Sequence, residues 1–223
     1  MTEPTRKTER LVWGGLIFII AAIGGIFALS KMIGGKPLPV IGQLSAFTLT
    51  NQNGEPVSLS SLGGKVWVAD IIFTRCAGPC PTMTHHLAEL QAALPPNESV
   101  RLVTLTSDPE YDTPPVLKRY AARFGADSNR WDFLTGPKPE IRRLAINDFK
   151  FVVVDVKPEE QKNAEDLFIH STWFVLVDQR GQVRGWTDSE GRLHAYFDSE
   201  DPSARTEILS AIKQLLREPA SST

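Results

Sequence analysis

The stretch Val66–Phe73 is an apolar run that constrains the fold more than any other segment of the chain. A strand that is apolar on both faces belongs in the centre of a parallel sheet with further layers above and below it. The only two cysteines of the sequence, Cys76 and Cys80, follow this run directly. In α/β proteins, ligands bind and reactive groups lie at the turns that lead from a strand into a helix. We therefore expect both thiols to lie together at one end of the sheet.

The rest of the chain alternates between strand and helix patterns. Asn53 and Gly54 suit the turn of a hairpin that covers residues 47–59. Further strand patterns cover residues 102–106, 131–134, 151–154, 173–177 and 183–186, and helical patterns cover residues 83–94, 114–124, 140–146 and 204–216. This order predicts a three-layer α/β domain of thioredoxin-like type with a hairpin inserted at its N-terminal side.

An apolar segment precedes this domain, with no polar side chain from Leu11 to Leu29. As a helix this run would be roughly 28 Å long, against about 30 Å for the hydrocarbon layer of a membrane. We therefore predict one transmembrane helix at residues 11–33. A cleaved signal peptide is the alternative, but its apolar region is shorter, ~7–15 residues. More basic residues precede the run (Arg6, Lys7 and Arg10) than follow it (Lys31 and Lys36), which favours a cytoplasmic N-terminus.

This topology divides the chain into a cytoplasmic tail (1–10), the anchor (11–33), a Gly- and Pro-rich linker (34–44) and the folded domain (45–218). The domain would face the periplasm, or an equivalent non-cytoplasmic compartment, from a single-pass inner-membrane anchor. Its cysteines would therefore meet oxidising conditions. The net charge of −2, without a basic stripe, argues against nucleic acid as a partner.

The spacing of Cys76 and Cys80 leaves three uses open. If both lie on the first turn of a helix, their Cα atoms are ~6 Å apart, within reach of a disulfide. A helix N-terminus would also lower the pKa of a thiol there. The pair could be a structural disulfide, but so short a loop contributes little stability. The other uses are a redox dithiol and a site for a soft metal ion.

His170 decides between the last two uses. Thioredoxin-type enzymes have two residues between their cysteines and a cis-proline opposite them, just before the closing hairpin. This chain has three intervening residues, and His170 precedes the hairpin where the proline would be. We expect His170 to approach Cys76 and Cys80, a ligand set that suits Cu(I). Zinc would accept the same ligands plus a water, and a hydrogen-bonded core histidine is the alternative for His170.

Five other side chains lie near these positions in the sequence or in the expected fold. Asp108 ends the strand beside the cysteine strand, where it would orient His170 or stabilise a cationic partner, or else is simply a turn residue. We expect Asp112 to cap the following helix together with Thr113. Met83 is predicted to be a core residue. His85 and His86 are consecutive on a helix, so at most one could face the site.

Three motifs in this order resemble the SCO/SenC copper chaperones of cytochrome oxidase assembly. They are residues 73–81 (FTRCAGPCP), residues 106–114 (TSDPEYDTP), and His170-Ser171 followed by residues 175–181 (VLVDQRG). The resemblance covers about Phe47 to Leu216 together with the N-terminal anchor.

This resemblance implies a membrane-tethered domain that binds copper through Cys76, Cys80 and His170. It would deliver copper to the site in cytochrome c oxidase subunit II or to another copper protein, or reduce the thiols of the subunit II site. A thiol reductant is the further partner that this implies. It implies a metallochaperone more than an enzyme; a thiol–disulfide oxidoreductase acting on exported proteins, with Cys76–Cys80 as its redox disulfide, is the alternative. The chain departs from the family at Ile169, where members often carry an aspartate, and at Ala77-Gly78-Pro79, where they commonly carry Pro-Asp-x.

Overall fold

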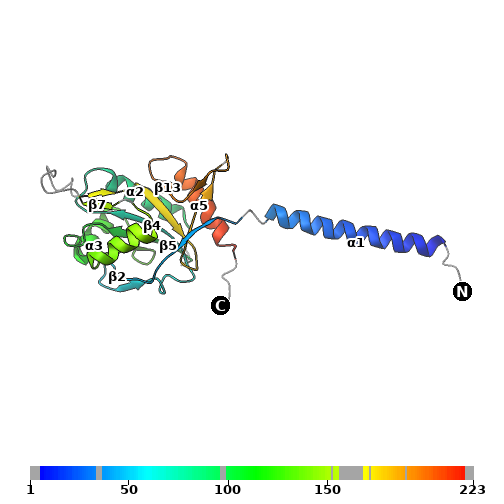
Figure 1. The fold of residues 1–223 in the computed structure, drawn as a ribbon, viewed down its shortest axis with the longest axis horizontal. Coiled ribbons are helices and arrows are strands. Elements are labelled where there is room, and N and C mark those ends of the chain that lie inside the picture. The colour runs from blue at the N-terminus through cyan, green and yellow to red at the C-terminus, as the bar shows by residue number, and fades with distance from the viewer. Residues whose placement is uncertain are drawn as a thin grey trace. The chain divides into compact units, whose positions relative to one another are not determined.

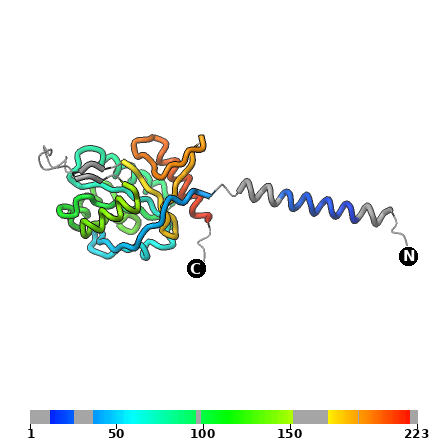
Figure 2. The backbone as a smooth tube through the Cα atoms, viewed as in Figure 1, coloured from blue at the N-terminus to red at the C-terminus, as the bar shows by residue number. Residues whose placement is uncertain are grey.

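The computed structural model of the protein describes residues 6–33, 37–95, 99–151, 153–155, 168–170, 172–188 and 190–218, and Figure 2 traces this backbone. The chain divides into two units, Met1–Pro37 and Leu38–Thr223. The first contains one helix, α1 (Arg6–Ile33), where the sequence predicts an apolar helix. A search of the described residues finds no helix both long and apolar enough to cross a membrane.

Seven strands form the main sheet of the second unit (Figure 1). In spatial order they are β1 (Val40–Gln43), β10 (Gln182–Arg184), β9 (Trp173–Val177), β4 (Val66–Ile72), β5 (Val100–Thr106) and β6 (Trp131–Leu134), with β13 (Phe197–Asp198) beside β9. Strands β4, β5 and β6 are parallel, whereas β9 is antiparallel to β4 with Ala69 opposite Val175. Every residue of β4 is buried, as predicted for a central strand.

Two apolar layers cover the two faces of this sheet, because strand side chains alternate between them. Three helices cover one face: α2 (Pro79–Ala93), α3 (Pro114–Arg123) and α5 (Ala204–Leu215). The other face is covered by the hairpin of β2 (Thr48–Thr50) and β3 (Pro56–Ser58), by α4 (Lys138–Arg142) and by the π-helical turn η1 (Arg143–Asp148). The predicted three-layer arrangement with an added hairpin is confirmed, and Gly54 has the expected positive φ of 83°.

Two short ladders complete the described strands. Strands β11 (Trp186–Thr187) and β12 (Leu193–His194) pair with each other, as do β7 (Val153–Asp155) and β8 (Phe168–His170). Strand β1 lies within residues 34–44 and pairs with β10. The pattern of residues 151–154 predicts a strand, which the structure has at β7.

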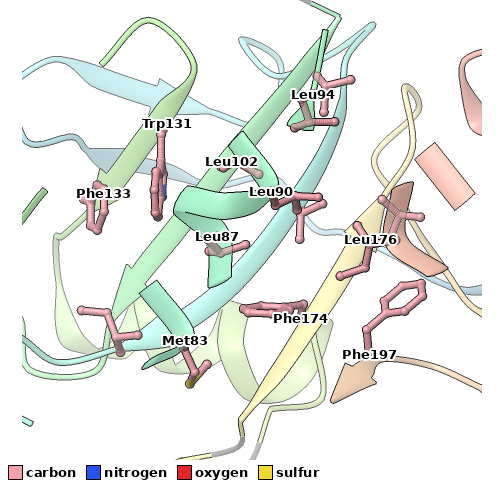
Figure 3. Close-up of a cluster of buried hydrophobic side chains, with 14 of the residues drawn as sticks. Met83, Leu87, Leu90, Leu94, Leu102, Trp131, Phe133, Phe174, Leu176 and Phe197 are labelled. Carbon is pink, nitrogen blue, oxygen red and sulfur yellow. The ribbon is translucent and has the colours of Figure 1, made fainter. Parts of the chain in front are cut away.

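The core on the α2 face is where the sheet and the helix that follows the cysteines meet. Figure 3 shows Met83, Leu87 and Leu90 of α2 in one cluster with Phe174 of β9. Met83 is 1% exposed, so its prediction as a core residue is confirmed. This packing fixes α2 against the sheet and thereby places the cysteines at its N-terminus.

Candidate metal and redox site

The cysteines lie in the connection between β4 and α2. A turn follows the strand, in which the Cys76 N–H donates to the Phe73 carbonyl at 3.2 Å. Helix α2 begins at Pro79 with Gly78 as its N-cap, so Cys80 is in the first turn and Cys76 precedes the helix. The condition that both cysteines lie on the first turn of a helix is therefore met by Cys80 and not by Cys76. The preference of proline for the first helical position explains why the helix begins at Pro79.

The two thiols nevertheless face each other. Cys76 is 9% exposed and Cys80 0% exposed, and both are free cysteines. A hydrogen bond joins the two side chains. Two thiols in hydrogen-bond contact can be oxidised to a disulfide, or can bind one soft metal ion after losing their protons.

The acidity of Cys80 is the opposite of what its place at a helix N-terminus suggests. Burial raises the pKa of the Cys80 thiol, and its hydrogen bond and charge interaction with Cys76 raise it further. The expected lowering by the helix is therefore overturned, because desolvation disfavours the thiolate more strongly than the helix terminus favours it. Cys80 is a protonated thiol at neutral pH.

A second buried group, Asp70 of β4, acts on the same thiol. Its carboxylate is 0% exposed and adds to the raised pKa of Cys80 by charge repulsion. It also contributes to the raised pKa of Tyr120, where burial is the larger cause. The Tyr120 hydroxyl lies 3.0 Å from Thr84 Oγ1, which donates to the Cys80 carbonyl at 2.8 Å. Sequence reasoning missed Asp70, although one acidic residue within an apolar strand is a readable signal.

Asp112 holds the backbone that leads into Cys76. Its Oδ2 accepts hydrogen bonds from Thr74 N–H at 3.0 Å and from Thr106 Oγ1 at 2.5 Å, and its Oδ1 accepts one from Thr74 Oγ1. The carboxylate is fully buried, and burial raises its pKa. Thr113 is the N-cap residue of α3, as predicted. The prediction that Asp112 shares this capping role is wrong, because its carboxylate binds Thr74 and Thr106 instead.

Asp108 binds the residue beside Cys76. Arg75 donates to Asp108 Oδ2 at 2.5 Å, and its guanidinium lies 4.1 Å from the centre of the Tyr111 ring. Asp108 therefore contacts the cysteine segment through Arg75. Whether it also orients His170 is not tested, since the side chain of His170 lies outside the described part of the structure.

The third predicted ligand is placed by its backbone alone. His170 ends β8, where it pairs with Val153. Among the described residues, no group of three or more His, Cys, Asp or Glu side chains is arranged to hold a metal ion. Of the two helix histidines, His85 has a 66% exposed side chain and lies 3.7 Å from Glu89. His86 lines a cavity with Glu89.

Comparisons with known proteins match most of the folded domain to one family. A family model described as SCO1/SenC matches residues 42–210. The SCO1 protein homolog of Bacillus subtilis is 42% identical over 164 residues, covering 72% of this chain and 82% of the relative. A putative copper-binding protein of Stutzerimonas stutzeri is 30% identical over 66% of this chain and 70% of its own.

Two solved structures are similar in fold. BsSco, described as a member of the Sco family of cytochrome c oxidase assembly proteins with a disulfide switch, has a TM-score of 0.65 at 34% identity, covering 82% of this chain and 100% of its own. Copper-bound ScoI of Bradyrhizobium japonicum has a TM-score of 0.60 at 25% identity, covering 78% of this chain and 99% of its own.

Proposed function

The chain belongs to the SCO1/SenC family, and from that premise we propose that it binds copper through Cys76, Cys80 and His170. One observation carries the proposal: the two thiols face each other at the N-terminus of α2, joined by a hydrogen bond. Two thiolates and an imidazole suit Cu(I), whose softness favours sulfur and which accepts low coordination numbers. Copper is the cargo of such a protein rather than a resident cofactor.

The strand register supports His170 as the third ligand. Ala69 of β4 lies opposite Val175 of β9, so Trp173 would lie opposite Ile71 if this pairing continued. The cysteines follow β4 and His170 precedes β9. Because the two strands are antiparallel, both segments lie at the same end of the strand pair.

We propose that the copper is delivered to subunit II of cytochrome c oxidase, or that the dithiol prepares that site by reducing its cysteines. Transfer would proceed by ligand exchange, in which a thiolate or imidazole of the partner displaces one ligand at a time. Cys80 is 0% exposed, so an ion bound by this thiol would be shielded from water on that side.

A membrane anchor is part of the proposal and is supported by the sequence between Leu11 and Leu29, which has no polar side chain. It would hold the copper domain at the periplasmic surface of the inner membrane, beside a membrane-bound partner. Extraction of membranes with alkaline carbonate tests this: an anchored chain stays in the membrane fraction, and a released chain contradicts the anchor.

Anaerobic titration of the reduced full chain with Cu(I) tests the ligand set. We expect one equivalent to bind, and His170→Ala to weaken binding by at least about 100-fold, since even groups outside the ligand set cost 10–100-fold. His85→Ala is the matched control, because its exposed imidazole lies on the same helix as Cys80. Unchanged affinity of His170→Ala would remove the histidine from the site. A parallel titration with Zn²⁺ tests the competing metal.

A thiol–disulfide oxidoreductase is the second candidate, favoured by the contact between the two thiols. It predicts turnover of a disulfide substrate when an electron donor is supplied, with His170→Ala as active as the parent chain. Loss of copper binding with retained turnover in this variant would separate the two functions.

A further inference from the structure

A cavity of about 260 Å³ lies between α2, the start of α5 and the segment that joins β13 to α5. Its apolar lining includes Leu90, Phe174 and Ile208, all part of the core cluster on this face; Leu90 and Phe174 are labelled in Figure 3. Pockets for drug-sized ligands measure about 300–1,000 Å³. The cavity therefore fits something smaller, such as one long side chain.

The rim of this cavity is acidic. Three carboxylates line it, those of Glu89, Glu200 and Asp201, together with the cation Arg205. Arg205 lies 3.0 Å from Glu89, which leaves two carboxylates in excess. The Ser203 N–H donates to Asp201 at 2.8 Å and lowers the pKa of that carboxyl, so Asp201 is charged at neutral pH.

Ser199 supplies a polar group to the wall of the cavity. It lines the cavity and is only 5% exposed. Its backbone N–H donates to the Thr172 carbonyl at 2.9 Å, while its hydroxyl has no hydrogen-bond partner among the described residues. A hydroxyl can both donate and accept a hydrogen bond, so Ser199 offers a polar contact to a group that enters the cavity.

We propose that this cavity binds the side chain of a lysine or arginine from a protein partner. The aliphatic stem would lie on Leu90 and Phe174, as such stems do on apolar surfaces. The cationic head would reach Glu200 and Asp201 through charge-assisted hydrogen bonds, and donate to the Ser199 hydroxyl. This recognition goes beyond copper binding and does not depend on it.

The place of the cavity on α2 gives this recognition a role in docking. Glu89 follows Cys80 by nine residues on the same helix, about 14 Å along its axis. A partner held by a basic side chain in this cavity would therefore have neighbouring surface within reach of the cysteines.

The test is a methyl NMR titration of the reduced full chain in detergent, with the Ile208 methyl group as reporter. The probe is Nα-acetyl-lysine amide, and its neutral match is Nα-acetyl-norleucine amide. We expect saturable shifts with the lysine probe alone, a several-fold weaker affinity in Ser199→Ala and an affinity about tenfold weaker in Glu200→Lys. Glu190→Lys is the control, because it makes the same charge change at an exposed position of the β11–β12 turn.

Three results would overturn the proposal: equal binding of the norleucine probe, an unchanged affinity in Glu200→Lys, or no shift with the lysine probe at any accessible concentration. Glu200 is exposed, so its replacement leaves the fold intact. Retention of Cu(I) binding by Glu200→Lys, measured in the same samples, distinguishes loss of the cavity from loss of the copper site.

Discussion

Thr74 and Arg75 are held by hydrogen bonds to carboxylates, whereas Cys80, a few residues further along, is held by apolar packing. On the first side, Asp112 accepts hydrogen bonds from Thr74, and Asp108 accepts one from Arg75. On the second side, Cys80 lies in the core cluster of α2, where burial raises its pKa. We call Thr74, Arg75, Asp108 and Asp112 the polar side, and Cys80 with the core residues around it the apolar side. The polar side determines the position of the cysteine segment, and the apolar side determines the reactivity of the Cys80 thiol. The two properties should therefore respond to different substitutions.

The largest effect is expected for Asp112→Ala, on the polar side. This change removes the acceptor of three hydrogen bonds and leaves a buried donor on Thr106 and part-buried donors on Thr74 without a partner. The free energy of unfolding should fall by about 2–3 kcal/mol, measured by urea denaturation. Glu110→Ala, an exposed carboxylate in the same loop, should change it by less than about 0.5 kcal/mol. Equal stability of both variants would mean that Asp112 does not hold the cysteine segment.

The pH dependence of Cu(I) binding tests the apolar side. Because burial raises the pKa of Cys80, the thiol is protonated at neutral pH, and copper must displace its proton. Affinity should therefore rise with pH, by about tenfold per pH unit for each proton displaced. Competition with a Cu(I) chelator between pH 6 and 8 measures this slope. A flat profile would show that the thiols are already ionised, against the assignment of burial as the dominant cause.

The sequence predicts the parts of this site that depend on local pattern. The buried strand before the cysteines, the hairpin turn at Gly54 and Thr113 as an N-cap are properties of a few adjacent residues, and the structure has all three. The core position of Met83 also follows from helical spacing alone. Each of these needs no knowledge of a distant segment.

What the sequence could not give depends on contacts between distant segments. Asp112 and Thr74 are 38 residues apart, so an aspartate just before a helix looks like a cap until the loops are brought together. The pKa of Cys80 is another case, since the depth of burial follows from packing against the sheet rather than from position in the helix. Strand β1 pairs with β10, which is far along the chain: Val40 lies opposite Arg184. The short, mixed sequence of β1 carries little strand signal of its own.

Asp70→Asn separates charge from burial on the apolar side. The Asp70 carboxylate raises the pKa of Cys80 by repelling the thiolate, in addition to the larger contribution of burial. Neutralising it should lower that pKa and make alkylation of the reduced protein by iodoacetamide at pH 8 a few-fold faster, because thiolate is the reacting form. Asp127→Asn makes the same chemical change at an exposed position and should leave the rate unchanged. Slower alkylation of Asp70→Asn would contradict the repulsion.

The smallest effect is expected at Tyr111, whose ring lies against Arg75 on the polar side. The ring is 46% exposed and its centre lies 4.1 Å from the Arg75 guanidinium. A cation–π contact this exposed contributes about 0.5–1 kcal/mol, so Tyr111→Ala should lower the free energy of unfolding by that amount. Tyr111→Phe keeps the ring face and should cost almost nothing in the same urea titration. If Phe costs as much as Ala, the hydroxyl rather than the ring supports Arg75, and the polar side would then consist of hydrogen bonds alone.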